Sequence, residues 1–84
     1  MQLQGGSTMV EFERDLDTRG LNCPLPILKT KKTMRDMNSG SVLRVTSSDP
    51  SSVKDFEAFC DQSGNELVDS SQEGRDFIFV IKKH

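Results

Sequence analysis

Two strand-to-helix transitions, each marked by proline, constrain the fold of this chain more than any other feature. In the first, Pro24 and Pro26 precede a run of helix-forming residues, 27–37. In the second, Asp49 is the expected N-cap of a helix and Pro50 its first residue. Proline is tolerated in the first turn of a helix because the N–H groups there lack intrahelical partners. The sequence therefore predicts two successive strand–helix units.

Strand-like periodicity precedes and follows these helices. Val10, Phe12, Arg14 and Leu16 alternate with acidic residues, which predicts a half-buried first strand. Three further strands are expected, at 42–46, at 66–70 as the weakest, and at 77–81. The last of these is apolar on both faces and should be interior, and the hairpin before it is expected to turn at Glu73-Gly74-Arg75.

Each predicted helix has one apolar face. In the first helix the face consists of Ile27, Thr30, Met34 and Met37, and Asn38-Ser39-Gly40 supplies the stop. In the second helix it consists of Val53, Phe56, Cys60 and Ser63, reinforced by Phe59, with Gly64 ending the helix.

The resulting order is βαβαββ, which predicts an α/β (α+β) two-layer sandwich. Both helices should pack on one face of a mixed four-stranded sheet, since this is the simplest way to bury their apolar stripes. Residues 1–9 are expected to form a flexible tail and residues 10–84 a single domain.

Several classes of protein are excluded by composition. The longest apolar run, 77–81, is far too short to span a bilayer, and the N-terminus lacks the features of a signal peptide. Two cysteines are too few for a disulfide scaffold. Cys23 and Cys60 lie far apart and the single histidine is the last residue, so neither a metal site nor a cofactor is expected. These features indicate a cytoplasmic protein with reduced thiols.

Charge is distributed unevenly along the chain. Between residues 29 and 44 there are five basic side chains and one acid, whereas residues 49–76 carry eight acids and two basic residues. The basic segment can be a solvated helix face or a docking surface for an acidic partner, with Lys29, Lys32 and Arg35 as the candidate contacts. Direct nucleic-acid binding is not expected at a pI near 5.3 without aromatic residues among the basic ones.

Cys23 is the main candidate for a reactive residue, and it lies in the loop between the first strand and the first helix. Open α/β sheets place their sites beyond the carboxyl ends of strands. A helix N-terminus also stabilises an anion, so we expect the pKa of Cys23 to lie below the ordinary thiol value of about 8.5. Pro24 and Pro26 remove two donors but rigidify the backbone, which leaves the N–H groups of Leu25 and Ile27 to solvate a thiolate.

Thiol exchange needs only one exposed, partly ionised sulfur, and no histidine base is positioned for Cys–His hydrolysis. Alternatives remain open at this point. Cys23 can be an ordinary buried cysteine in a non-catalytic module that binds protein or RNA. It can also form a redox pair with Cys60, although Cys60 shares a helix face with Val53 and Phe56 and is expected to pack in the core.

The stretch Leu16-Asp17-Thr18-Arg19-Gly20-Leu21-Asn22-Cys23-Pro24-Leu25-Pro26 resembles the signature of the TusA/SirA-like sulfur carrier family. The hallmark is Cys-Pro-x-Pro behind the Gly20-Leu21 pair. The resemblance spans residues 14–83 and continues through Asp49-Pro50, Asp55-Phe56, Phe59-Cys60 and Gly64-Asn65-Glu66-Leu67. Asn22 departs from the arginine carried by tRNA-thiolating members.

This resemblance implies a βαβαββ sandwich and a function. Cys23 would accept sulfane sulfur as a persulfide, supported by the motif residues Gly20, Leu21, Pro24, Leu25 and Pro26, and would pass it on. The implied donors are cysteine desulfurases or rhodanese-like proteins. The implied acceptors serve tRNA thiolation, sulfur oxidation or cofactor sulfuration.

Overall fold

Four strands and two helices follow one another in the predicted order. The computed structural model describes residues 12–84. Their elements are β1 (Arg14–Asp17), α1 (Leu25–Arg35), β2 (Val42–Ser47), α2 (Ser52–Ser63), β3 (Glu66–Glu73) and β4 (Asp76–Lys82). No helix in this part of the chain is long and apolar enough to cross a membrane.

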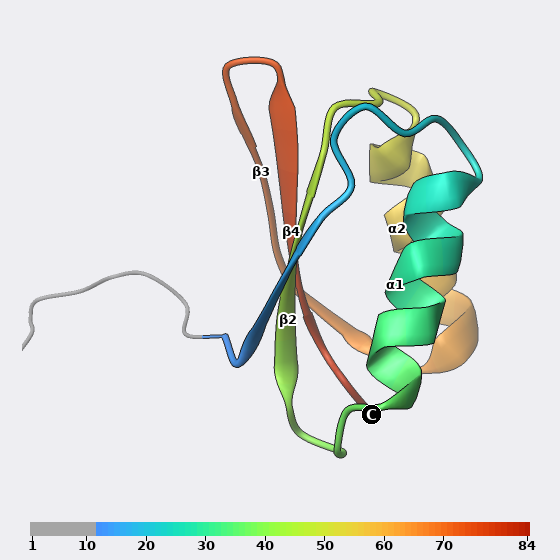
Figure 1. Ribbon diagram of the computed structural model, residues 1–84. Coiled ribbons are helices and arrows are strands. Elements are labelled where there is room, and N and C mark those ends of the chain that lie inside the picture. The colour runs from blue at the N-terminus through green and yellow to red at the C-terminus, as the bar shows by residue number, and fades with distance from the viewer. Residues whose placement is uncertain (1–11) are drawn as a thin grey trace, which may run out of the picture.

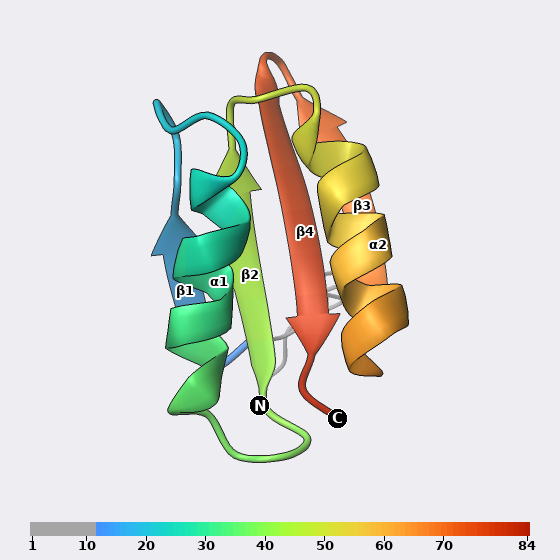
Figure 2. The same ribbon diagram turned by 90° about the vertical axis from the view of Figure 1, so that its right-hand side faces the viewer.

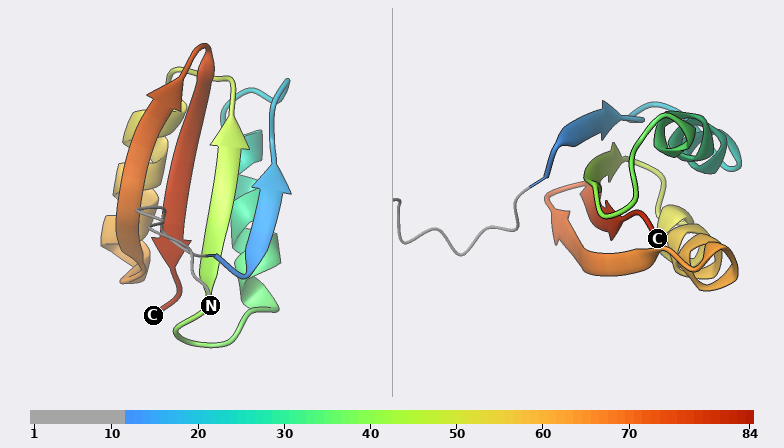
Figure 3. Two further views of the ribbon diagram at one scale, coloured as in Figure 1. Left: turned by 90° about the vertical axis from the view of Figure 1, so that its left-hand side faces the viewer. Right: turned by 90° about the horizontal axis from the view of Figure 1, so that it is seen from below.

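The strands form one mixed sheet in the order β1-β2-β4-β3. β1 runs parallel to β2, while β4 pairs antiparallel with both β2 and β3. Both helices cover the same face of this sheet (Figure 1), and the view from below in Figure 3 shows the two layers separately. The predicted two-layer βαβαββ sandwich, with β4 as an interior strand, is confirmed.

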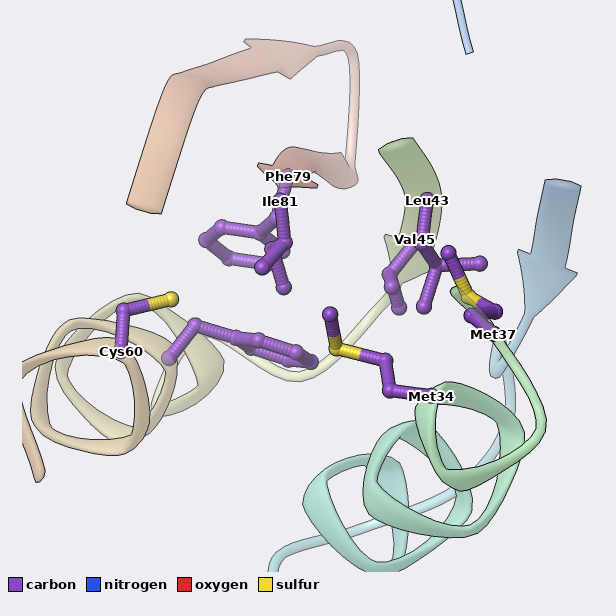
Figure 4. Packing of buried hydrophobic residues seen from close by; sticks show 8 residues of the cluster. Met34, Met37, Leu43, Val45, Cys60, Phe79 and Ile81 are labelled. Carbon is purple, nitrogen blue, oxygen red and sulfur yellow. The ribbon is translucent and has the colours of Figure 1, made fainter. Parts of the chain in front are cut away.

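The core lies between the helices and the inner face of β2 and β4. Leu43 and Val45 alternate with half-buried residues along β2 and pair in register with Ile81 and Phe79 of β4, so all four side chains reach the same face. The helices contribute Met34 and Cys60, which point toward the sheet in Figure 4. Phe56 of α2 stacks on Phe79, with ring centroids 4.4 Å apart.

The first strand is shorter than predicted. β1 comprises only Arg14–Asp17, and Leu16 is its one side chain packed against the core. Val10 and the predicted tail, 1–9, lie outside the described residues. The whole of this short strand pairs with β2, since the register runs from Arg14 opposite Leu43 to Asp17 opposite Thr46.

α1 begins at Leu25, two residues before the predicted start, and ends at Arg35, two residues before the predicted end. The early end has a local cause. Asp36 and Met37 make tighter i→i−3 backbone bonds to Thr33 and Met34. The Lys83 ammonium donates hydrogen bonds of 2.6 Å to the carbonyls of both Met34 and Met37, which satisfies the end of the helix from a distant part of the chain.

α2 begins later than predicted, at Ser52 with Ser51 as N-cap, so the assignment of Asp49 as N-cap and Pro50 as first residue is wrong. The Asp49 carboxylate instead accepts the Ser51 amide at 3.0 Å and forms a turn before the helix. Gly64 ends α2 in the left-handed conformation, as predicted. Ser63 is exposed, and the buried face of α2 consists of Ser52, Phe56 and Cys60.

The C-terminal hairpin is longer than predicted, because β3 runs to Glu73 rather than ending at residue 70. Its second half consists of exposed polar residues paired one by one with β4. Backbone hydrogen bonds to β4, rather than burial of apolar side chains, hold this edge strand in place. Its sequence therefore shows no alternation of apolar and polar residues. The predicted turn is confirmed, with Gly74 at a φ of +62°.

Candidate active site

Cys23 is an exposed residue of the loop that joins β1 to α1. The carboxyl ends of β1 and β2 and the N-termini of α1 and α2 all lie at one edge of the sandwich (Figure 2). The β1–α1 loop therefore lies beside the β2–α2 loop, at the edge where α/β sheets carry their sites. This is the position that the sequence predicts for the thiol.

Hydrogen bonds tie these two loops together. The Cys23 amide donates to Asp49 Oδ2 at 2.8 Å, and the Gly20 amide donates to Ser48 Oγ at 2.9 Å. Thr18 is fully buried, and its hydroxyl donates to the Thr46 carbonyl at 2.7 Å. Gly20 has a φ of +84°, a conformation that glycine adopts without a steric penalty. The predicted Gly20-Leu21 pair thus forms the turn that brings the chain to Cys23.

The motif prolines lie where α1 begins. Pro24 is the N-cap residue after a cis Cys23–Pro24 peptide bond, and Pro26 is a buried residue of the first turn. The Leu25 amide donates to the Asn22 carbonyl at 2.8 Å, so it is not free to solvate a thiolate as predicted. Of the two expected donors, the Ile27 amide alone lacks a hydrogen-bond acceptor among the described residues.

A groove of about 410 Å³ runs from Cys23 between the two helices. Ile27, Ala58 and Phe59 give it an apolar lining, while Asp55 and Lys31 supply opposite charges. The Lys31 ammonium lies 6.0 Å from the centre of the Phe59 ring. The sulfur therefore lies at a concave surface wide enough to receive part of another molecule.

Acidic neighbours set the electrostatics of the thiol. Hydrogen bonding to the Asp55 carboxylate raises the pKa of Cys23 most, followed by desolvation and by the negative charges of Asp55 and Asp49. The prediction of a lowered pKa at the helix start is therefore wrong. The helix dipole amounts to about half a charge, two prolines remove donors from the first turn, and nearby carboxylates disfavour the thiolate.

Asp49 and Asp55 are the site residues that sequence reasoning missed. The sequence predicts Asp49 as a helix cap and as part of the family resemblance, yet its two oxygens bind the amides of Cys23 and Ser51, which lowers the pKa of its carboxyl group. The signal was present in the topology. Residues that follow β1 and residues that follow β2 must meet at the same edge of a parallel pair.

The predicted docking residues Lys29, Lys32 and Arg35 are exposed on α1. Their spacing places them on one stripe of the helix together with Leu25 and Leu28, which are 46% and 52% exposed. Sequence reasoning did not single out Leu28. The stripe formed by these five residues, the α1 face, is apolar near Cys23 and basic further along. Arg44 is not part of it, since it pairs with Asp15 at 3.1 Å on the sheet.

Cys60 lies in the core, where it is only 6% exposed. Burial raises its pKa to about 11, so this thiol is protonated at neutral pH and screened from solvent. The structure thus agrees with the prediction that Cys60 packs beside Phe56, and gives no support to a role as a resolving thiol.

Comparison with known proteins agrees with the fold and shows the family. The family described as Sulfurtransferase TusA matches residues 14–83. The sulfur carrier protein TusA of Allochromatium vinosum is 59% identical over 75 residues, which cover 89% of this chain and 99% of that protein. The sulfur carrier protein TusA of Pseudomonas paraeruginosa is 38% identical over 68 residues, covering 81% and 86%.

A crystal structure of a SirA-like protein from Desulfitobacterium hafniense matches with a TM-score of 0.75, covering 83% of this chain and 96% of that one. Its sequence identity of 18% limits this likeness to the fold, whereas the sequence matches establish the relationship. The chain belongs to the TusA sulfurtransferase family.

Proposed function

We propose that the protein is a sulfur carrier that accepts sulfane sulfur on Cys23 and passes it to a cysteine of an acceptor protein. The observation that carries the proposal is an exposed cysteine that lines a groove, in a chain of the TusA family. No metal or organic cofactor is required for this reaction, because each step is an exchange between sulfur atoms.

The chemistry balances without an oxidant or a reductant. Cys23 Sγ attacks the terminal sulfur of a donor persulfide R–S–SH, and a new Sγ–S bond forms while the donor S–S bond breaks. The donor leaves as a thiol R–SH and the carrier becomes Cys23–S–SH. An acceptor thiolate then attacks the terminal sulfur of the carrier and regenerates the Cys23 thiol.

The geometry supports transfer between proteins. The Cys23 backbone is held by Asp49, so the point from which the thiol projects is fixed. We propose that the α1 face docks partner proteins. Leu25 and Leu28 would cover apolar surface next to the thiol, and Lys29, Lys32 and Arg35 would face an acidic surface of the donor.

The partners are a persulfide donor, such as a cysteine desulfurase or a rhodanese-like protein, and a downstream acceptor protein. We place the relay in the cytoplasm, where thiols are kept reduced. Outlets of such relays are tRNA thiolation, sulfur oxidation and cofactor sulfuration. Asn22, in place of the arginine of tRNA-thiolating members, gives no reason to prefer the first of these.

Intact mass tests the proposal directly. After incubation with a small-molecule persulfide donor, the wild type and Cys60→Ser should gain about 32 Da, one sulfur atom, and Cys23→Ser should gain none. A wild type without any adduct would overturn the carrier function and favour a docking module. An intramolecular disulfide between Cys23 and Cys60 on mild oxidation would instead indicate a redox protein.

A further inference from the structure

Asp55 is a second carboxylate of the site, and it faces the same groove as the Cys23 thiol. It lies in the first turn of α2, is half-buried and lines the groove together with Cys23. Within residues 12–84 its carboxylate makes no ion pair, and no protein amide or hydroxyl donates to it. Its backbone amide donates to the Ser51 carbonyl at 3.2 Å, as part of the helix start.

The other carboxylate of the site is fully engaged. Asp49 uses one oxygen for the Cys23 amide and the other for the Ser51 amide, at 2.8 and 3.0 Å. Taking a proton on Asp49 would therefore weaken the bonds that hold the loop. Asp49 positions the backbone, whereas Asp55 is free to exchange a proton.

Other bases are absent from the lining of the groove. Lys31 is the other ionisable side chain besides Cys23 and Asp55 in that lining, and an ammonium group has no lone pair to accept a proton. His84 lies at the C-terminus, where its amide donates to the Asn65 side chain. Figure 1 shows this terminus at the opposite end of the helices from the β1–α1 loop.

We propose that Asp55 is a catalytic residue that accepts the Cys23 thiol proton during sulfur transfer and returns it to the leaving thiolate. This inference rests on the proposed carrier function. As Cys23 Sγ attacks the terminal sulfur of R–S–SH, the thiol proton moves to the Asp55 carboxylate and the S–S electron pair leaves with R–S⁻. The proton then passes from Asp55 to that thiolate and gives R–SH. One carboxylate thus serves both halves of a transfer in which protons and electrons are conserved.

A docked partner favours this exchange. Covering the groove excludes water from the carboxylate, and desolvation favours the neutral, proton-bearing form of a carboxyl group. In the free protein the same carboxylate holds Cys23 as a thiol, since it raises the pKa of the sulfur. The carrier is thereby kept less reactive toward oxidants and alkylating agents between transfers.

Asp55→Asn separates a proton acceptor from a mere electrostatic neighbour, because the two roles predict opposite changes in transfer rate. Removal of the negative charge should speed alkylation of Cys23 by iodoacetamide at pH 7 in either case. If Asp55 only repels the thiolate, loading from a small-molecule persulfide should also become faster. If Asp55 moves the proton, loading should become slower, by roughly 100-fold.

The experiment measures both rates on the full chain, with intact mass as the readout of loading. Asp61→Asn is the matched control, because Asp61 is an exposed carboxylate of the same helix that does not line the groove; both of its rates should equal those of the wild type. Asp55→Glu keeps a carboxylate and should load faster than Asp55→Asn. In denaturant all variants should be alkylated at the same rate. If Asp55→Asn is alkylated faster than the wild type only without denaturant, the variant is folded.

Loading of Asp55→Asn at the wild-type rate or faster would overturn the role of Asp55 and leave the carrier function intact. A wild type that takes up no sulfur would overturn the carrier function itself, and the role of Asp55 with it. Slow loading combined with fast alkylation is the result that the inference predicts.

Discussion

The amide of Cys23 donates a 2.8 Å hydrogen bond to a carboxylate oxygen of Asp49, 26 residues further along the chain. This bond joins the β1–α1 loop to the β2–α2 loop and fixes the backbone from which the thiol projects. The second oxygen of Asp49 holds the amide of Ser51 before α2. A single side chain therefore couples the position of the nucleophile to the start of the second helix.

Asp49→Ala should impair sulfur loading more than it impairs folding, because it frees the Cys23 backbone while the core remains packed. The loading rate and the urea midpoint are the two quantities to compare. Asp49→Asn keeps one acceptor oxygen and should fall between the wild type and Asp49→Ala. If Asp49→Ala loaded at the wild-type rate, the bond to Cys23 would be irrelevant to transfer.

Acid should destabilise the protein through two carboxyl groups. Arg19 lowers the pKa of Asp17 to about 2, and the amides of Cys23 and Ser51 lower that of Asp49. Both folded values lie below the ordinary value of 3.8, so the unfolded chain binds more protons. The stabilisation that the ionised Asp17 and Asp49 carboxylates provide is present above about pH 4 and is lost as the pH falls toward 2.

Urea midpoints measured from pH 5 to pH 2 test whether protonation of these two carboxyl groups destabilises the fold. The loss on acidification should be smaller in Asp49→Asn and in Asp17→Asn than in the wild type. Asp61→Asn serves again as the exposed control and should lose as much stability as the wild type. A steeper acid loss in Asp49→Asn would contradict the assignment.

The order of elements follows from the sequence because it depends on local signals. Prolines at the start of α1, glycines in left-handed turns and the apolar run of β4 each act within a few residues, and the sequence predicts the elements and turns that they form. The errors concern contacts between distant segments. Lys83 bonds to the end of α1 from the C-terminal segment, and Asp49 accepts the distant amide of Cys23 as well as the nearby amide of Ser51.

The site was predicted less completely than the fold for the same reason. Cys23 could be located from the motif and from the strand–helix boundary. Its pKa could not be predicted, because the Asp55 carboxylate that raises it comes from another helix. Local reasoning captured the helix dipole and missed a larger, opposing charge contributed by tertiary packing.

Lys83→Met should destabilise the fold by about 2 kcal/mol, since the charged ammonium donates to two backbone carbonyls at the end of α1, those of Met34 and Met37. Chemical denaturation provides the measurement. Lys82→Met is the control, because Lys82 is an exposed neighbour and its substitution should change stability by less than about 0.5 kcal/mol. Equal effects of the two substitutions would show that the bonds to Met34 and Met37 contribute nothing.

Phe56→Ala should cost about 3–5 kcal/mol, because the Phe56 ring is fully buried and stacks on Phe79. A domain of this size has roughly 5–15 kcal/mol of stability in total, so the variant should be only marginally folded at 25 °C. Val68→Ala at the exposed edge strand is the comparison and should retain near-wild-type stability. A loss below about 1 kcal/mol for Phe56→Ala would indicate that the stacked pair is not a main element of the core.

The two cysteines should differ sharply toward a thiol-reactive probe. Native protein should be labelled once, at Cys23, since Cys60 is buried and has a pKa raised to about 11. Unfolding in guanidinium should expose the second thiol and permit double labelling. Rapid labelling of Cys60 in the native state would mean that the core opens far more readily than its packing indicates.

The location of the accepted sulfur tests the central claim most directly. Wild-type protein is incubated with a persulfide donor, blocked with an alkylating agent, cleaved and analysed by tandem mass spectrometry. We predict an additional sulfur, about 32 Da, between Sγ and the alkyl group on the peptide that contains Cys23, and an unmodified or simply alkylated Cys60. Sulfur found on Cys60, or on neither cysteine, would contradict the account.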